Sequence, residues 1–350
     1  MAGGPTLVVG AGQAGLAAAW HLQRACMRFR IVDAAGRVGD SWRRRYDALT
    51  MFTPRFLSAL PGLPLDGDRE GYAGRDEFAD YLENYARRFA IPVETSRRVE
   101  RLTKCADGGF LAEMADGERI AAANVIVASG SFQQPNIPSL ASGFNPAVIQ
   151  IPASAFRNPA GVPEGTVLVV GDGASGRDIA AELAATHRVL IATGKSRKLF
   201  SERVLGKSMW WWLARLRLLR VPTDSLLGRW MRRTDPLPDR DRSLESLRRR
   251  GVTVAGRLVA AGGRRADFAD GLFEQIDSVV WTTGYRDDSG WVAIAGAADD
   301  DGNFLHREGV SPVPGLYFVG RPWQRNRASG LVMGADADAA WIVRKVAQRR

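Results

Sequence analysis

Two short glycine-rich turns, each directly after an apolar run typical of a β-strand, constrain the fold of this 350-residue chain more than any other feature. Residues 6–9 precede GAGQAG at residues 10–15, and residues 166–170 precede GDGASG at residues 171–176. In such a turn the first glycine permits the tight bend, the second lets the backbone approach a pyrophosphate, and the third lets the helix pack on the strand. The sequence therefore predicts two dinucleotide-binding units.

The first unit carries an acidic residue where a ribose ligand is expected. Helical spacing continues after the turn to about Met27, and a second β-run over residues 29–32 ends at Asp33. The N-terminus of the helix offers unpaired N–H groups and the positive end of its dipole to a phosphate. A carboxylate in the position of Asp33 accepts hydrogen bonds from ribose hydroxyls. The first unit therefore suits a dinucleotide whose ribose hydroxyls are free.

The second unit has a basic run where the first has its acid. Its β-run over residues 189–192 is followed by TGKSRK at residues 193–198. A carboxylate here would repel a 2′-phosphate, whereas Lys195 and Arg197 would attract one. We therefore predict NADPH in the second unit, with an ordinary solvated loop as the alternative interpretation of the basic run.

The remainder of each unit also repeats. VIVASG at residues 125–130 and SVVWTTG at residues 278–284 are β-runs that end in a hydroxyl residue and a glycine. Such runs suit buried parallel strands whose ends pass close to a ligand. The sequence therefore predicts an α/β fold of two Rossmann-like domains, the second inserted in the first. The expected boundaries place residues 1–150 and 286–350 in one domain and residues 151–285 in the other.

A segment near the C-terminus belongs to the first copy. GLYFVG ends a β-run at Gly320, and a stretch with helical spacing begins after Gly330 at Leu331. The N-terminus of that helix would face an anionic ligand group, such as a reduced flavin ring.

The region at about 195–235 is a Trp- and Arg-rich insertion. GKSMWWWLARLRLLRV at residues 206–221 sets three tryptophans against alternating arginine and leucine. We favour a helix that covers the gap between the domains with its arginines in solvent, because apolar helical faces are usually core. The alternatives are a lid over the substrate and an amphipathic segment at a membrane surface.

Composition disfavours several other classes of protein. The net charge is +10, but no recognition helix or RNA-binding signature accompanies the scattered basic residues. Cys26 and Cys105 form no C-x-x-C pair, and His21, His187 and His306 are too scattered for a metal cluster. No apolar run reaches the roughly 18 residues of a spanning helix, and the N-terminus lacks the regions of a signal peptide. We therefore expect a cytoplasmic protein with no metal, no nucleic-acid partner and no integral membrane segment.

Six motifs occur together in one order and spacing. They are GAGQAG, GDSWRRRYDALTMFTPRFLSALPGLPL at residues 39–65, ASGSFQQPNIP at 128–138, GDGASG, WTTGY at 281–285 and GLYFVGRPWQ at 315–324. In these motifs the chain resembles the flavin-containing monooxygenase superfamily, in particular the bacterial flavoproteins called CzcO-like and, more distantly, the plant YUCCA enzymes. The resemblance covers nearly the whole chain.

The resemblance implies FAD in the first domain and NADPH in the second. It implies that NADPH reduces the flavin, that oxygen adds to give a flavin hydroperoxide, and that this species oxygenates a small organic substrate at nitrogen, sulfur or carbon or by Baeyer–Villiger insertion. Trp42 and Phe52 would lie near the flavin, and no side chain is assigned as catalytic because the flavin carries the chemistry. The predicted cofactor-binding residues are Gly10, Gly12, Gln13, Ala14, Gly15, Asp33, Gly39, Ser41, Trp42, Ser129, Gly130, Gly171, Gly173, Ala174, Ser175, Gly176, Lys195, Arg197, Thr283, Gly284, Gly320, Gly330 and Leu331.

Two departures from the superfamily's pattern bear on the oxygen chemistry. The fingerprint histidine aligns with Pro152, and the asparagine that the animal enzymes place beside the flavin aligns with Phe52. Pro152 offers no side-chain donor, and Phe52 excludes water but donates no hydrogen bond. We therefore expect a short-lived hydroperoxide that decays to hydrogen peroxide unless the substrate is present.

Two further interpretations stand beside the monooxygenase. The first is an NADPH-dependent flavoprotein reductase or dehydrogenase without oxygen insertion, which the two departures favour somewhat. The second is a cofactor-bound redox-sensing or interaction protein, which the intact glycines of both turns disfavour. A disulfide reductase is disfavoured because the two cysteines form no redox pair.

Overall fold

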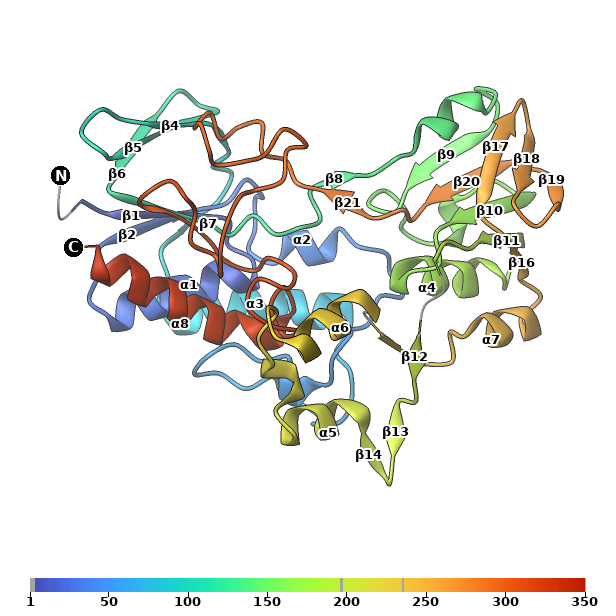
Figure 1. Ribbon diagram of the computed structural model, residues 1–350, viewed down its shortest axis with the longest axis horizontal. Helices are drawn as coiled ribbons and strands as arrows, with labels where there is room; N and C mark the ends of the chain where they lie inside the picture. The colour runs from blue at the N-terminus through green and yellow to red at the C-terminus, as the bar shows by residue number, and fades with distance from the viewer. Residues whose placement is uncertain (1–3, 196–197, 235, 350) are drawn as a thin grey trace.

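The computed structural model describes residues 4–195, 198–234 and 236–349, and within them it contains two five-stranded parallel sheets (Figure 1). The first sheet has the order β22-β7-β1-β2-β3 and the second the order β16-β11-β10-β20-β9. The strands of the first sheet are β1 (Thr6–Val9), β2 (Phe29–Val32), β3 (Val93–Glu94), β7 (Asn124–Val127) and β22 (Leu316–Phe318). Those of the second are β9 (Ile149–Pro152), β10 (Thr166–Val170), β11 (Arg188–Ala192), β16 (Thr253–Ala255) and β20 (Ser278–Trp281).

The first sheet lies between a helical layer and an antiparallel ribbon, and together they form the first lobe. Helices α1 (Gln13–Arg24), α3 (Arg75–Arg88) and α8 (Val332–Gln348) cover one face, where Leu16, Ile126 and Ile342 are fully buried. The ribbon β4 (Val99–Lys104), β5 (Phe110–Met114) and β6 (Arg119–Ala122) covers the other face. Figure 1 shows α1 and α8 side by side beneath the sheet and the ribbon above it.

The second sheet has the same three layers, which form the second lobe. Helices α4 (Ala174–Leu183) and α7 (Leu244–Arg249) bury Val167 and Val169 of β10, and the ribbon β17 (Leu258–Gly262), β18 (Arg265–Phe268) and β19 (Phe273–Gln275) buries Leu168. Successive side chains of a strand point to opposite faces, so a continuous apolar run fills both cores. The repeated layering confirms the predicted fold of two dinucleotide-binding units.

The duplication extends to single hydrogen bonds. The N–H of Gly10 donates to the carbonyl oxygen of Val32 at 2.8 Å, and the N–H of Gly171 donates to that of Ala192 at 3.0 Å. Each bond links a turn to the end of the neighbouring strand, so the first turn and β2 correspond to the second turn and β11.

The chain crosses between the lobes through an antiparallel pair, β8 (Gln134–Pro135) with β21 (Tyr285–Arg286). The predicted boundary at residue 150 falls within β9, which pairs with β20 of the second sheet, and β22 returns to the first sheet. The assignment of one cofactor to each domain stays a prediction. The remaining elements are α2 (Asp40–Arg43), η1 (Arg55–Leu57), η2 (Ser139–Gly143), η3 (Pro159–Gly161), β12 (Leu199–Phe200), β13 (Arg203–Val204), β14 (Lys207–Ser208), α5 (Met209–Arg215), η4 (Leu218–Arg220), α6 (Leu226–Thr234) and β15 (Leu237–Pro238).

A tryptophan of the insertion is buried against the first lobe. Trp210 on α5 is 1% exposed and packs in a cluster with Phe52, Leu219 and Ala328. The N–H of Ala328 donates to the carbonyl oxygen of Leu219 at 3.2 Å, which ties η4 to the loop before α8. This part of the insertion is therefore a cover on the first lobe.

Helix α6 differs from the expectation that its apolar residues are core. Leu226, Leu227 and Trp230 are 80%, 43% and 55% exposed, whereas Gly228 and Met231 are buried. The helix packs through Gly228 and Met231, and most of its other side chains are exposed. No helix in the described part of the chain is long and apolar enough to cross a membrane.

Trp210→Ala should release the cover from the first lobe. Truncation of a buried tryptophan costs about 3–5 kcal/mol, and we expect this loss as faster amide hydrogen exchange over residues 209–220. The matched change Trp230→Ala removes an exposed ring and should alter exchange there by less than about 0.5 kcal/mol. Equal effects of the two changes would contradict the anchoring role of Trp210.

Candidate cofactor sites

The first turn has two glycines that its own packing requires and one that it does not. Gly10 has a φ of +104°, and a Cβ there would lie 2.6 Å from the carbonyl oxygen of Ala128. A Cβ on Gly15 would lie 1.8 Å from the carbonyl oxygen of Gly10. At Gly12 the φ is −73°, and a Cβ would meet no atom of the described residues within 4 Å. A glycine here leaves the backbone open to the close approach of a ligand.

The second turn repeats this arrangement. Gly171 has a φ of +108°, and a Cβ there would lie 2.7 Å from the carbonyl oxygen of Thr282. A Cβ on Gly176 would lie 2.0 Å from the carbonyl oxygen of Gly171. Gly173 has a φ of −71°, and its surroundings are open for 4 Å as far as the structure describes the chain. Both turns therefore fit a phosphate-bearing ligand at their second glycine.

The helices that follow the turns present uncapped N-termini. Gly12 and Gly173 are the N-cap residues of α1 and α4, so no side chain accepts from the first N–H groups. Gln13 and Ala174 are the first helical residues, and neither first turn contains an acid. Free N–H groups and the helix dipole favour an anion at such an end.

Asp33 lies at the end of β2 and holds the first turn. Its Oδ2 accepts from the N–H of Ala11 at 2.6 Å, and its Oδ1 accepts from the N–H of Ala35 at 2.8 Å. Each carboxylate oxygen has a further lone pair, so the same group can accept from ribose hydroxyls. The side chain of Asp33 is half-buried.

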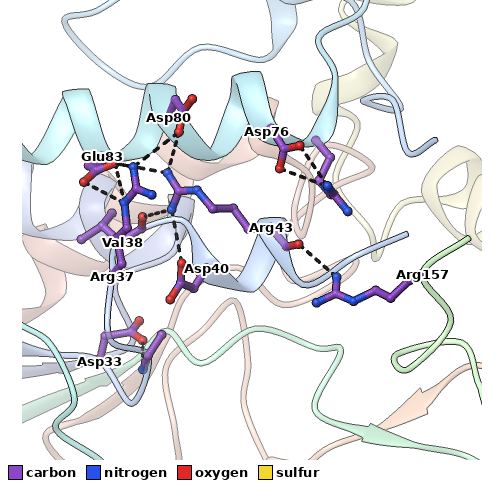
Figure 2. Close-up of polar contacts among 11 residues, drawn as sticks. Asp33, Arg37, Val38, Asp40, Arg43, Asp76, Asp80, Glu83 and Arg157 are labelled. Carbon is purple, nitrogen blue, oxygen red and sulfur yellow. Dashed lines mark hydrogen bonds and ion pairs between the residues drawn. The ribbon is translucent and has the colours of Figure 1, made fainter. Parts of the chain in front are cut away.

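A network of ion pairs fixes the segment that begins at Gly39. A Cβ on Gly39, whose φ is +89°, would lie 2.5 Å from the carbonyl oxygen of Ala79 on α3. Arg43 extends to the same helix, where its Nη2 lies 2.6 Å from Asp80 and 3.2 Å from Glu83 (Figure 2). Helix α2 is therefore held against α3.

This placement brings Trp42 to the first turn. Its Nε1 donates to Oε1 of Gln13 at 3.2 Å, and its ring meets Phe78 edge to face at 4.8 Å. Two of the predicted cofactor-binding residues are thus in contact, whereas Ser41 is exposed. Their contact with FAD stays a prediction.

Further predicted residues of the first lobe lie where neighbouring parallel strands end. Gly320 follows β22, and a Cβ there would lie 2.7 Å from the Cβ of Ala14 on α1. Ser129 and Gly130 follow β7, which lies between β22 and β1. Open α/β sheets bind their ligands at this edge.

Gly330 and Leu331 enter α8 from a loop that a buried carboxylate organises. Asp338 is 1% exposed on α8, pairs with Arg325 at 3.4 Å and also bonds Ser329. The Ser329 hydroxyl accepts from the N–H of Arg325 at 3.1 Å. Burial raises the pKa of Asp338 above its usual range, although Ser329 and Arg325 act in the opposite direction.

The predicted nicotinamide site has a threonine in place of the acid. The N–H of Thr193 donates to the carbonyl oxygen of Ala255 at 3.1 Å, and the N–H of Asp33 donates to that of Glu94 at 2.9 Å. Thr193 therefore occupies the position of Asp33. Lys195 is exposed two residues farther on. Arg197 lies outside the described residues.

Thr283 and Gly284 lie where β20 leads to the crossing between the lobes. The hydroxyl of Thr283 donates to the carbonyl oxygen of Asn136, next to β8. These residues therefore belong to the junction as well as to the second sheet's edge.

Sequence patterns miss the residues that join the lobes. The hydroxyl of Tyr46, from the first lobe, donates to Asp178 on α4 at 3.0 Å and also meets Ser175. Burial, followed by the charge of Asp178, raises the pKa of Tyr46 well above its usual range, so the phenol stays protonated. Arg45 lies over the rings of Phe132 and Tyr285 at 4.5 and 5.8 Å.

The two residues that depart from the superfamily's pattern lie in different settings. Phe52 is half-buried against Trp210, with the ring centroids 5.5 Å apart. Pro152 ends β9, opposite Trp281 of β20. Neither side chain can donate a hydrogen bond.

Comparison with known proteins adds a family and near relatives. Residues 7–207 match the family described as pyridine nucleotide-disulphide oxidoreductase. An uncharacterized CzcO-like oxidoreductase of Geobacillus kaustophilus (strain HTA426) is 40% identical over 97% of both chains. The uncharacterized oxidoreductase CzcO of Bacillus subtilis (strain 168) is 33% identical over 97% of this chain and 98% of its own. The indole-3-pyruvate monooxygenase YUCCA1 of Oryza sativa subsp. japonica is 27% identical over 97% of this chain and 90% of its own.

Solved structures share the fold over nearly the whole chain. A flavin-containing monooxygenase from Stenotrophomonas maltophilia has a TM-score of 0.83, with 24% identity and 99% of both chains covered. The bacillithiol disulfide reductase Bdr from Staphylococcus aureus has a TM-score of 0.72, with 14% identity and coverage of 99% and 98%. The fold is therefore common to oxygenating and reducing flavoproteins.

Gly12→Ala and Gly15→Ala should have opposite consequences. Gly12→Ala adds a methyl group to open space, so the protein should fold normally but bind FAD at least about tenfold more weakly. Gly15→Ala drives a methyl group into a backbone carbonyl and should destabilise the fold itself, by about 3 kcal/mol or more. Flavin content, FAD titration and urea unfolding of the apoproteins separate the two effects. If the Gly12→Ala apoprotein lost as much stability to urea as the Gly15→Ala apoprotein, the interpretation that Gly12 faces a ligand would be wrong.

Proposed function

We propose that the chain, which belongs to the pyridine nucleotide-disulphide oxidoreductase family and to the flavin monooxygenase superfamily, is an NADPH-using monooxygenase that oxygenates a small organic substrate. FAD and NADPH are the cofactors of this superfamily. The observation that carries the proposal is the pair of turns in which only the second glycine, Gly12 or Gly173, borders open space. Cys26 and Cys105 are free thiols, as suits a cytoplasmic enzyme.

The first lobe would hold FAD through its turn and the segments around it. The N–H groups at the start of α1 would bind the pyrophosphate, and Asp33 would accept from the ribose hydroxyls. Trp42, fixed by Gln13 and Phe78, would lie beside the flavin. The N-terminus of α8, after Gly330, would stabilise negative charge on the flavin ring.

The second lobe would hold NADPH at the start of α4, with Lys195 near the 2′-phosphate. When bound, FAD supplies the electron and oxygen chemistry and NADPH the hydride. The protein then positions the two and excludes water, and the apolar cluster of Phe52, Trp210 and Ala328 suits the second task. Tyr46, bonded to Asp178, would keep the lobes in register.

The relatives support a small organic molecule as the substrate. The YUCCA relatives are named for indole-3-pyruvate, a small organic acid, and the oxygen here would go to nitrogen, sulfur or carbon or enter beside a ketone. A second candidate is a flavoprotein reductase or dehydrogenase, which Phe52 and Pro152 favour because neither donates a hydrogen bond. A redox-sensing or interaction protein would need no turnover of NADPH.

The purified protein should contain non-covalent FAD and consume oxygen when NADPH is added. Without substrate, most of the NADPH oxidised should appear as hydrogen peroxide, because Phe52 and Pro152 offer no donors to protect an oxygen adduct. Flavin analysis, an oxygen electrode and a peroxide assay measure this. NADPH oxidation that needs an electron acceptor other than oxygen would support the reductase, and no NADPH oxidation at all would refute both enzymes.

Lys195→Ala should weaken the binding of NADPH selectively. A charge-assisted contact with a phosphate contributes about 1.5 kcal/mol, so the KM for NADPH should rise about tenfold while that for NADH stays nearly constant. Lys207→Ala, on the exposed β13–β14 hairpin, is the matched control. An equal effect of Lys195→Ala on both nucleotides would mean that the basic run is an ordinary solvated loop.

A further inference from the structure

In the first lobe, a carboxylate at the strand end ties the turn in place. Asp33 follows β2 and accepts from the N–H of Ala11, the residue between the first two glycines, at 2.6 Å. This bond joins the end of β2 to the turn. It also leaves a negative charge beside the ribose site, where a 2′-phosphate would be repelled.

In the second lobe the turn and the strand end are also joined by a carboxylate, but here the carboxylate comes from the turn. The residue between the first two glycines is Asp172, and its Oδ1 accepts from the N–H of Gly194, just after β11, at 3.1 Å. The counterpart of Asp33 is Thr193, whose hydroxyl donates to the carbonyl oxygen of Ala255 at 2.9 Å. The turn and the strand end are still joined, but the carboxylate belongs to the turn.

A buried arginine accompanies the relocated carboxylate. Asp172 and Arg177 are 5% and 4% exposed, and Nη2 of Arg177 lies 3.1 Å from Oδ2 of Asp172. Nε donates to the carbonyl oxygen of Asp172 at 2.8 Å, and Nη1 donates to that of Arg242 at 2.9 Å. The counterpart on α1 is Leu16, which is fully buried in the apolar core.

The exchange of leucine for arginine has an electrostatic reason. A buried carboxylate without a partner is strongly unfavourable, and an unpaired charge here would also act on a nearby phosphate through a medium of low dielectric constant. Arg177 removes both problems while it leaves the Oδ1 contact with Gly194 intact. Three substitutions relative to the first lobe, Asp172, Arg177 and Thr193, thus act as one unit.

We propose that Asp172 and Arg177 are specificity-determining residues for the 2′-phosphate of NADPH: the carboxylate that joins turn and strand has moved to the turn and is neutralised there, so that the strand end carries no acid. The inference rests on the proposed use of NADPH. Asp172 and Arg177 are positioning residues, because they shape the end of β11 and cancel a charge, and the phosphate itself is met by residues such as Lys195.

Binding of two adenosine nucleotides to the FAD-containing protein tests this inference. The probes are 2′,5′-ADP, which carries the 2′-phosphate, and 5′-ADP, which does not, and isothermal titration gives the Kd of each. Arg177→Gln leaves Asp172 uncompensated, so binding of 2′,5′-ADP should weaken about tenfold more than binding of 5′-ADP. Asp172→Asn/Arg177→Gln removes the excess charge and keeps an acceptor for Gly194, so the preference should return to within about twofold of the original.

A second pair of variants serves if Arg177→Gln does not fold, which circular dichroism and flavin content would reveal. Thr193→Asp restores an acid at the strand end and leaves the Asp172–Arg177 pair intact. It should weaken the binding of 2′,5′-ADP at least about tenfold relative to the binding of 5′-ADP, whereas Thr193→Asn should not.

The outcomes separate a failure of this inference from a failure of the proposed use of NADPH. Three results would overturn the inference alone. The first is an equal loss of affinity for both nucleotides in Arg177→Gln. The others are a preference that the double variant does not restore and an unchanged preference in Thr193→Asp. If the unmodified protein shows no preference for 2′,5′-ADP over 5′-ADP, the proposed use of NADPH fails and the inference fails with it.

Discussion

The approach of each helix to a backbone carbonyl is the constraint on which the rest of the structure depends. At Gly15 and Gly176 the helices α1 and α4 come so close to the carbonyl oxygens of Gly10 and Gly171 that no side chain fits between them. Each helix therefore starts directly where its strand ends, and its unpaired N–H groups face the carboxyl edge of the sheet. Predicted cofactor-binding residues lie along that edge because neighbouring parallel strands end there as well.

Besides the crossing pair β8–β21, one segment of the first lobe contacts the second lobe. Gly39 and Arg43 hold α2 against α3, and Tyr46, a few residues farther on, buries its ring against the helices of the second lobe. Burial and the charge of Asp178 raise the pKa of the Tyr46 phenol, which stays protonated and can donate to Asp178. Two cofactors that exchange a hydride need the lobes in a fixed relation, since reacting atoms must be held in near-contact.

The insertion serves both the interior and the surface of the molecule. Trp210 buries its ring beside Phe52 and Ala328, next to the loop that leads into α8. Helix α6 instead buries Gly228 and Met231 and leaves Leu226 and Trp230 in solvent, although its spacing is that of an amphipathic helix. An apolar stripe indicates burial only where a neighbouring element is present to cover it.

The sequence by itself determined the two strand–turn–helix units, their duplication and the first and third glycines of each turn, because a positive φ or a very close backbone approach admits only glycine there. These signals lie within a few residues of one another and can be recognised in the chain alone. Only the tertiary structure decided which groups serve each turn: Asp33 holds Ala11 from 22 residues away, and Arg177 meets the carbonyl of Arg242 from 65 residues away. Such contacts depend on how distant segments pack, and neither hydrophobic periodicity nor motif spacing carries that information, because the side chains meet only after the sheets have formed.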